Sequence, residues 1–364
     1  VMRRGWLTMG EETAAFEEAF AAFVGAKQAV AVTNCTAALH LSCLALGLKA
    51  GDEVIVPSLS FVATANAVRY TGAKAVFADV ISERDLCIDP EAIAAKITPQ
   101  TRAIMVMHYG GYACDMRRIM ALAEAHGLPV IEDAAHAPGA ALDGRALGTW
   151  GRAGCFSFFS NKNMTTGEGG MISCEDENLA AELRHLRSHG MTTVTWDRHK
   201  GHAWSYDVLA SGYNYRLDEI RAAIGQVQLR KLASNNEKRR ELDQLYVEML
   251  GEMAPEVTVP FVDHRGISAH HIRPVLLPEG HDRAQFMEAM KEAGIQTSIH
   301  YPPIHQFRAY RGESGGQDLP RTELVAAREV TLPLYPQMTR RQVQRVVEAV
   351  RAAIHLGSSF REMG

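Results

Sequence analysis

Short apolar runs alternate with helical patterns through the first two-thirds of this 364-residue chain. Typical runs are AVAVT at 29–33, EVIVP at 53–57 and AIMVMHY at 103–109, and a segment with helical spacing of apolar residues follows each of them. Uninterrupted apolar strands are buried on both faces, as happens where helices connect parallel strands and cover both sides of a sheet. The alternation therefore predicts an α/β fold with a mostly parallel sheet.

The pattern changes in the last third of the chain. A long helical pattern covers 217–250, and the elements of a second α/β unit follow it: a strand at 272–278, a helix at 282–293, a short strand near 296–300 and a final helix after Thr339. The spacing of the final helix turns four valines inward, Val343, Val346, Val347 and Val350. We predict a large domain at 1–235, with an N-terminal segment at 1–10, and a smaller C-terminal domain at 236–364.

Composition argues against several classes of protein. The formal net charge is −4 and the chain has no basic block, so we expect no nucleic-acid partner. No apolar stretch approaches the roughly 20 residues of a membrane span, and the first residues, VMRRGW, lack the apolar core of a secretion signal. The six cysteines form no C-x-x-C pair, which suits reduced thiols in the cytoplasm.

Polar residues gather just after the predicted strands, at the edge where α/β sheets bind ligands. One of these segments, FSFFSNKNMTTGEGG, places Lys162 between two asparagines after an apolar run. A lysine amine presented from a dry site has a lowered pKa and can attack an aldehyde. The alternative is a solvated loop lysine.

Three further strand ends carry candidate residues, each with an ordinary alternative. In PVIEDAAHAPGA, one carboxylate of the pair Glu132 and Asp133 could keep a heterocyclic nitrogen protonated, as pyridoxal phosphate requires, with His136 one turn on; a helix cap is the alternative. Thr36 in TNCTAALH lies at a strand-to-helix junction that suits a phosphate, unless Thr36 simply caps the helix. Phe61 in SLSFVATA could stack on a planar ring or belong to the core.

Other patterns point to chemistry that we do not expect. GESGG at 312–316 matches G-x-S-x-G but follows no strand, so a hydrolase elbow is not predicted. His185 and His189 stand one helical turn apart without a third ligand, and we predict no metal site. The chain has no G-x-G-x-x-G or Walker pattern. The stretch at 189–212, rich in His and Trp, is predicted to be a functional loop.

Several motifs together resemble one enzyme family. EDAAHAPGA, FSFFSNKNMTTGEGG, GYNYRLDEIRAAIGQVQL at 212–229 and TLPLYPQMT at 331–339 are similar to the pyridoxal-phosphate sugar aminotransferases of the DegT/DnrJ/StrS family. The resemblance runs from about Gly5 to the C-terminal helix. It implies fold type I of the pyridoxal-phosphate transferases, with a mostly parallel mixed sheet flanked by helices in the large domain and a smaller C-terminal α/β domain.

The resemblance also implies roles for particular residues. Pyridoxal 5′-phosphate would be held covalently by Lys162, which would also move the proton, and pyridoxamine 5′-phosphate would be the intermediate form. Asp133 would pair with the pyridine nitrogen, His136 would lie near the phenolic oxygen and Phe61 would stack on the ring. The phosphate would be bound by four residues: Thr36, Ala37, Ser157, and Asn214 of a second subunit. A homodimer with shared sites follows.

Substrate-binding candidates come from the same resemblance. They are Trp6, Tyr215 and Arg216, together with His300, Tyr301, His305 and Tyr310 of the HYPPIHQFRAY stretch. The 189–212 loop would border the dimeric site. Two features depart from the family: Cys35 stands where many members have glycine, and the chain starts at RRGWLTMG, so an upstream helix of the family is expected to be missing.

The implied reaction is a ping-pong amino transfer from L-glutamate to a nucleotide-linked keto-sugar, with the 4-keto-6-deoxy type preferred. A 3-keto sugar or a ketocyclitol such as an inosose is the alternative acceptor. A regulator or sensor that binds pyridoxal phosphate without catalysis is the alternative from a different class. The complete set of lysine, aspartate and phosphate-binding residues favours the enzyme.

Overall fold

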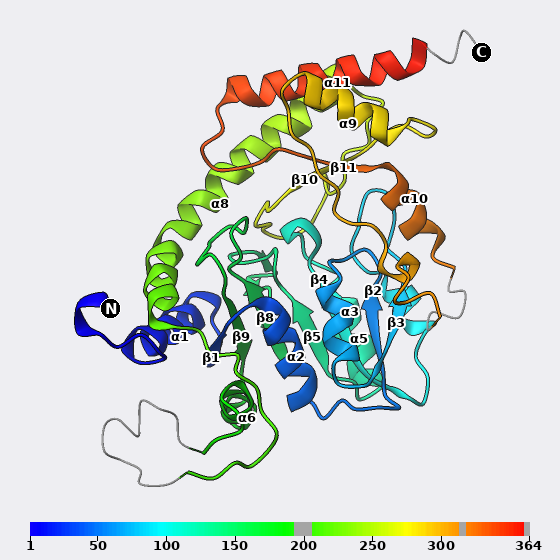
Figure 1. Cartoon of the computed structure of the whole chain (residues 1–364). Helices are drawn as coiled ribbons and strands as arrows, with labels where there is room; N and C mark the ends of the chain where they lie inside the picture. Colours follow the sequence, from blue (N-terminus) through cyan, green and yellow to red (C-terminus); the bar gives the residue numbers. More distant parts are fainter. Residues whose placement is uncertain (193–205, 313–317, 360–364) are drawn as a thin grey trace.

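The computed structural model of the chain describes residues 1–192, 206–312 and 318–359. A seven-stranded sheet lies at the centre of its larger lobe, in the order β1-β9-β8-β5-β4-β2-β3 (Figure 1). The strands are β1 (Gln28–Val32), β2 (Glu53–Pro57), β3 (Lys74–Ala78), β4 (Thr101–Met107), β5 (Val130–Asp133), β8 (Ala153–Ser157) and β9 (Gly170–Cys174).

Most neighbouring strands of this sheet are parallel. β3, β2, β4, β5 and β8 pair in parallel, whereas β9 runs antiparallel to both β8 and β1. The predicted mostly parallel mixed sheet is therefore confirmed. Because β9 reverses direction between β8 and β1, the carboxyl ends of β1, β5 and β8 meet at one edge of the sheet.

Alternate residues of each strand enter two different cores, as the two-residue period of a strand requires. Along β1, Ala29 and Ala31 join one core, and Val30 and Val32 join the other. The first core contains α1 (Glu11–Val24), α4 (Pro90–Ala94), α5 (Met116–Ala125) and the first half of α8 (Glu219–Met253). The second contains α2 (Cys35–Ala45), α3 (Ala63–Arg69) and α6 (Glu177–Arg187). Helices thus cover both faces of the sheet.

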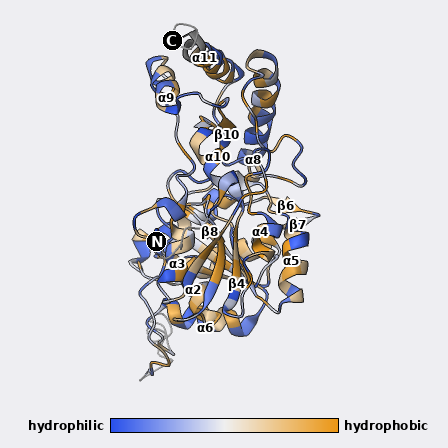
Figure 2. Ribbon diagram, turned by 90° about the vertical axis from the view of Figure 1, so that its right-hand side faces the viewer, coloured by the Kyte–Doolittle hydropathy of each residue, from blue (hydrophilic) through white to orange (hydrophobic). Residues whose placement is uncertain are grey.

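The long helix α8 leaves the sheet and continues into a smaller lobe, which lies at the top of Figure 2. There its second half packs with α9 (Arg283–Glu292), α11 (Arg340–Ser359) and the antiparallel strands β10 (Arg273–Leu276) and β11 (Glu329–Leu332). The four valines predicted to face inward from the final helix are all buried in this third core. The sequence pattern therefore predicted both the helix and its buried face.

The chain differs from the prediction at two points in this region. No strand forms at 296–300; Ser298 makes only an isolated bridge to Thr331. The chain then returns to the sheet, where Ile304, Tyr310 and Leu319 are buried in the second core. Residues predicted for the small domain therefore also cover the large one.

Short elements complete the fold: η1 (Met2–Arg4), η2 (Tyr109–Gly111), β6 (Ala141–Leu142), β7 (Arg145–Ala146), η3 (Ile304–Gln306) and α10 (Pro320–Arg328). No helix in the described part of the chain has the length and apolar character needed to cross a bilayer.

Candidate active site

A cavity of about 400 Å³ lies at the sheet edge where β1, β5 and β8 end. Residues of the β1–α2 junction, of β5, of the loop after β8 and of the segment at 300–301 line it. Many of the residues predicted for the site meet here: Thr36, Phe61, Asp133, His136, Ser157, Lys162, His300 and Tyr301. The strand-end clustering in the sequence therefore corresponds to one cavity.

Lys162 reaches the cavity from a tight turn after β8. Its backbone N–H donates to the carbonyl of Phe159 at 3.0 Å, and the N–H of Thr166 donates to Phe158 at 2.9 Å. Desolvation lowers the pKa of the Lys162 amine to about 8, although the nearby Asp133 carboxylate acts in the opposite direction. At pH 7 about a tenth of the amine is therefore uncharged and nucleophilic, far more than for an ordinary lysine.

Asp133 ends β5 and is 4% exposed. Its Oδ2 accepts the hydroxyl proton of Thr64 at 2.8 Å, and its Oδ1 accepts the N–H of Ala135 at 3.2 Å. The Thr64 hydroxyl lies 2.6 Å from that of Ser60, which extends the network into α3 and the turn before it. Burial raises the pKa of Asp133 above its ordinary value, and the Thr64 hydrogen bond opposes that rise. Thr64 and Ser60 both lie in SLSFVATA, where the sequence analysis singled out only Phe61.

Asn163 fixes the loop that carries Lys162. Its amide nitrogen donates to the carbonyl of Ala269 at 2.7 Å and to Asn236 Oδ1 at 2.8 Å. Its oxygen lies 2.8 Å from Nδ1 of His271. Sequence reasoning missed this anchor, although the asparagine beside the lysine was a visible signal, because its partners lie far along the chain.

His136 and Tyr301 form a hydrogen-bonded pair on the wall of the cavity. The N–H of Gly110 donates to His136 Nδ1 at 3.3 Å, so in the neutral ring the proton lies on Nε2. Burial lowers the pKa of His136 well below its ordinary value, which keeps the ring neutral. Nε2 lies 2.9 Å from the Tyr301 hydroxyl and donates to it. The Tyr301 hydroxyl proton is then free to bind an acceptor in the cavity.

The N-terminus of α2 faces the same cavity through Asn34, Cys35 and Thr36. The helix is capped by the side chain of Asn34, which accepts the N–H of Ala37 at 2.8 Å, so the alternative reading of Thr36 as the cap is wrong. Ala37 itself does not line the cavity.

Gly170 at the start of β9 makes this close approach possible. A Cβ placed on Gly170 would lie 2.5 Å from the carbonyl carbon of Asn34, so no larger residue fits there. Gly170 therefore lets β9 pass directly beside the helix terminus, near Ser157 at the end of β8.

Phe61 and His300 also line the cavity. Phe61 is 55% exposed, and its ring centre lies 6.0 Å from that of Tyr301, so it is not the core residue of the alternative reading. Nδ1 of His300 lies 2.9 Å from the hydroxyl of Thr331 in β11. Both aromatic side chains thus border the space above Asp133 and Lys162.

Two predicted substrate-binding residues lie elsewhere. His305 is buried, with Nδ1 2.7 Å from the Ser58 hydroxyl and Nε2 3.0 Å from Glu323 Oε1. Tyr310 is 1% exposed, donates to Asn66 Oδ1 at 2.5 Å and packs on Phe77. His305 lies in η3 and Tyr310 follows it, and both side chains point inward, so within this chain they hold the 304–310 segment to the large lobe and do not line the cavity.

The remaining candidates also lie outside this cavity. Trp6 donates to the carbonyl of Met9 at 3.1 Å, and Arg216 forms a bridge with Val32. The Tyr215 hydroxyl lies 3.2 Å from Nδ1 of His40. Asn214 is exposed and pairs through its backbone with Ser188. None of the four lines the cavity of its own chain.

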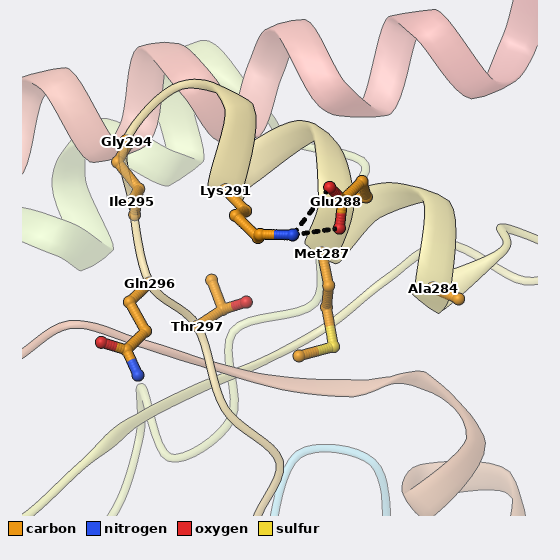
Figure 3. Close-up of a pocket in the computed structure, with 8 residues that line it drawn as sticks. All are labelled: Ala284, Met287, Glu288, Lys291, Gly294, Ile295, Gln296 and Thr297. Carbon is orange, nitrogen blue, oxygen red and sulfur yellow. Dashed lines mark hydrogen bonds and ion pairs between the residues drawn. The ribbon is translucent and has the colours of Figure 1, made fainter.

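A second hollow, of about 520 Å³, lies between α9 and the segment at 294–297 (Figure 3). Its charged lining residues are Glu288 and Lys291, which pair with each other at 2.9 Å one helical turn apart and are both exposed. A solvated ion pair of this kind has an ordinary environment. Volume alone therefore does not single out a site, whereas buried polar groups from separate elements do.

Other sequence features are placed as follows. No group of three or more His, Cys, Asp or Glu residues in the described ranges is arranged to hold a metal ion, and this includes His185 and His189. All of GESGG after Gly312 lies outside the described residues, as does the part of the 189–212 stretch at 193–205.

Comparison with known proteins gives consistent matches over the whole chain. The sequence model of the DegT/DnrJ/EryC1/StrS aminotransferase family matches residues 1–351. The spore coat polysaccharide biosynthesis protein SpsC of Bacillus subtilis (strain 168) is 42% identical over 357 residues, which are 96% of this chain and 91% of SpsC.

Solved structures match equally broadly. The crystal structure of DesI in the presence of its TDP-sugar product is similar with a TM-score of 0.88 and 33% identity, covering 100% of this chain and 90% of DesI. Spr1654 from Streptococcus pneumoniae matches in its PLP form and its PMP form with TM-scores of 0.89 and 0.90. Both forms are 25% identical to this chain and cover 98% of it and 94% of Spr1654.

Proposed function

Since this chain belongs to the DegT/DnrJ/EryC1/StrS aminotransferase family, we propose that it moves an amino group from L-glutamate to a nucleotide-linked keto-sugar. The chain is a sugar aminotransferase, and its cofactor is pyridoxal phosphate. The observation that carries the proposal is the convergence of Lys162 and Asp133 on one cavity beside the N-terminus of α2.

The lining residues fit pyridoxal phosphate in size and chemistry. When bound, this cofactor supplies a carbonyl that combines with amines and a ring that accepts electrons from the adjacent carbon. Asp133 accepts only two hydrogen bonds within the described part of the chain, which leaves acceptor capacity for a protonated ring nitrogen. The amides of the first turn of α2, together with the hydroxyls of Thr36 and Ser157, are suited to a phosphate.

Each residue has a separate task in this proposal. Lys162 provides the amine that attaches the cofactor and afterwards carries a proton on Nζ. Asp133, held by Thr64 and Ala135, keeps a positive charge on the ring nitrogen. Tyr301, which accepts from His136, directs its hydroxyl proton toward an oxygen in the cavity, and Phe61 covers the ring face.

The nature of the acceptor rests on the relatives. SpsC is described as a spore coat polysaccharide biosynthesis protein, and DesI was solved in the presence of its TDP-sugar product. We propose a nucleotide-linked 4-keto-6-deoxy sugar as acceptor in a ping-pong reaction, with a 3-keto sugar or a ketocyclitol as the alternative. Testing a panel of such ketones against the pyridoxamine form would show which acceptor is used. Preference for an unlinked cyclitol would contradict the nucleotide-sugar proposal.

An apolar stripe on α8 supports a homodimer. Ile220, Ile224 and Val227 are 40%, 42% and 41% exposed and recur at helical spacing. We propose that a second copy covers this stripe and that Asn214, outside its own cavity, reaches the phosphate of the partner's cavity. Sedimentation would contradict the dimer if the active protein ran as a 39.9 kDa monomer.

A cytoplasmic location is also proposed. All six cysteines are buried and free, as expected for a protein kept in a reducing compartment. Fractionation of the source cells would contradict this if the protein appeared outside the cytoplasm.

The function is tested by locating the cofactor. Borohydride reduction of the loaded protein followed by peptide mapping should place pyridoxal phosphate on the peptide containing Lys162. Lys162→Ala should lose this attachment, and Lys291→Ala, in the exposed ion pair of the second hollow, is the matched control that should retain it. Attachment at another lysine, or its persistence in Lys162→Ala, would refute the assignment. A non-catalytic binder would show the attachment but would release no 2-oxoglutarate from L-glutamate.

A further inference from the structure

A buried carboxyl group that the proposed reaction does not use lies behind the cavity. Glu329, the first residue of β11, is 0% exposed. Its Oε2 accepts the backbone N–H of His300 at 2.8 Å, and its Oε1 lies 2.5 Å from the hydroxyl of Thr331. In the described part of the chain no cation lies within ion-pair distance of it, so the group is held by hydrogen bonds alone.

Thr331 connects this carboxyl group to the cavity. Its hydroxyl lies between Glu329 Oε1 and Nδ1 of His300, which is 2.9 Å away. His300 lines the cavity, and its Nε2 makes no hydrogen bond within the part of the chain that the structure describes. Burial lowers the pKa of His300 to about 4, so the ring is neutral and carries one proton, on either Nδ1 or Nε2.

The position of that proton depends on Glu329, because the Thr331 hydroxyl has a single hydrogen. When Glu329 is ionised, Thr331 donates to it and must accept from Nδ1–H of His300, so Nε2 presents a lone pair to the cavity. When Glu329 is protonated, it donates to Thr331, Thr331 donates to Nδ1, and Nε2–H becomes a donor. One proton therefore reverses the whole chain of hydrogen bonds.

We propose that Glu329 and Thr331 are positioning residues that set whether Nε2 of His300 donates or accepts a hydrogen bond, and thereby how the carboxylate of the amino donor is received. This inference rests on the proposed function, because it assumes an amino-acid donor. A carboxylate can only accept hydrogen bonds, so it is bound by Nε2–H and repelled by the lone pair. A sugar hydroxyl can both donate and accept a hydrogen bond. The hydrogen-bonded chain of Glu329, Thr331 and His300, here called the relay, would therefore distinguish the two substrates that use the cavity.

Other ionisable groups also face this relay. Tyr301 follows His300 in the same segment, Tyr109 donates from η2 to the carbonyl of His300, and Arg283 of α9 contributes a positive charge. Burial raises the pKa of both tyrosines, so they stay neutral. His300 itself faces Lys162 and His136.

The titration of Glu329 falls in a measurable range. Burial raises its pKa to about 8, against the opposing effects of the Thr331 and His300 hydrogen bonds and of Arg283. The group is therefore protonated below about pH 8 and ionised above it. Binding of a carboxylate should weaken as the pH rises through this value.

Glutarate is a suitable probe because it has two carboxylates and no amine that titrates. Calorimetry on the loaded wild-type protein should show binding that weakens roughly tenfold between pH 7 and pH 9, the size expected for one lost charge-assisted hydrogen bond. In Glu329→Gln the amide oxygen accepts from His300 N–H and the amide nitrogen donates to Thr331. This variant is locked with Nε2–H and should bind glutarate almost equally at both pH values.

Thr331 offers a second, independent pair of variants. Thr331→Val removes the hydroxyl and should abolish the pH dependence, whereas Thr331→Ser keeps the hydroxyl and should preserve it. A wild-type affinity that does not change with pH, or an unchanged pH dependence in Glu329→Gln or Thr331→Val, would overturn the relay. If the wild type also fails to release 2-oxoglutarate from L-glutamate, the proposed function fails as well, so the two failures are distinguishable.

Discussion

Glu132 and Asp133 are neighbours in β5, yet their carboxylates have opposite surroundings on the two faces of the sheet. Glu132 is 0% exposed and accepts three hydrogen bonds, from His108 Nε2 at 2.9 Å and from the N–H groups of Gly148 and Gly151 at 2.7 Å each. Asp133 accepts two, from Thr64 and Ala135, and its other side faces the cavity.

The difference separates a structural carboxylate from a functional one. The N–H of Cys114 donates to His108 Nδ1, so Nε2 carries the proton that binds Glu132. Glu132 thus joins β4, β5 and the turn before β8 in a closed network with little acceptor capacity to spare. Asp133 has capacity left and an open space in front of it. Burial and charge are common to both groups, and the unsatisfied side marks the site.

The largest effect is expected at Asp133. Asp133→Asn keeps the shape and the hydrogen bond from Thr64, but it cannot hold a positive charge on the ring nitrogen. We expect kcat to fall by on the order of 10²–10³-fold or more, as for loss of one preorganised electrostatic partner. The free energy of unfolding should change by no more than about 1 kcal/mol. Steady-state kinetics and urea unfolding measure the two quantities. A large loss of stability with normal kcat would show that Asp133 has a structural role and not a functional one.

Glu132→Gln is the matched variant on the other face. One of its three donors would then face an amide N–H, so we expect the free energy of unfolding to fall by about 2–4 kcal/mol. The folded fraction should keep its kcat within about threefold, because the cavity is unchanged. A kcat as low as that of Asp133→Asn in well-folded protein would show that Glu132 belongs to the site.

Thr64 tests whether the position of Asp133 matters as well as its charge. Thr64→Val removes the hydroxyl that donates to Oδ2 and should lower kcat roughly tenfold, whereas Thr64→Ser should restore most of it. The absorbance of the bound cofactor, followed against pH, should shift in Thr64→Val only. Equal behaviour of the two variants would mean that Thr64 acts only through packing.

The smallest expected effect is a shift in the titration of Lys162. Desolvation lowers its pKa to about 8 while Asp133 raises it, so the rate at which pyridoxal phosphate combines with the apoprotein should reach half its maximum near pH 8. Removing the Asp133 charge takes away the opposing attraction, so Asp133→Asn should move this midpoint to lower pH. Glu132→Gln should leave it in place. Stopped-flow measurement of the combination rate against pH gives this midpoint for each variant. Equal shifts in both variants would contradict the assignment of Asp133 to the cavity and of Glu132 to the structural network on the other face.

Some of the site could be predicted because it depends on local order along the chain. Lys162, Ser157 and the acidic pair at 132–133 lie at or just after the ends of apolar strands, and parallel strands bring their carboxyl ends together wherever the sheet forms. The four inward valines of α11 follow from helical spacing in the same way. These predictions needed no knowledge of how distant segments pack.

Other features depend on contacts between distant segments and were missed or misplaced. Asn163 is satisfied by Ala269 and His271, more than a hundred residues away, and no local pattern indicates this. His305 and Tyr310 stand in a motif that looks exposed, but both are buried, His305 against Ser58 after β2 and Tyr310 against Asn66 of α3. Which of two adjacent acidic residues faces the ligand likewise follows from the register of β5 in the sheet, which its sequence alone does not specify.

The most direct test of the account is a single-turnover measurement. Protein loaded with pyridoxal phosphate is mixed with excess L-glutamate and no keto-sugar, and the 2-oxoglutarate released is counted. Because the amino group has no acceptor, we predict a burst of about one equivalent per chain and then a stop, with further release once a keto-sugar is added. Lys162→Ala should give no burst. Absence of 2-oxoglutarate from the wild-type protein, or its continuous release without an acceptor, would contradict the account.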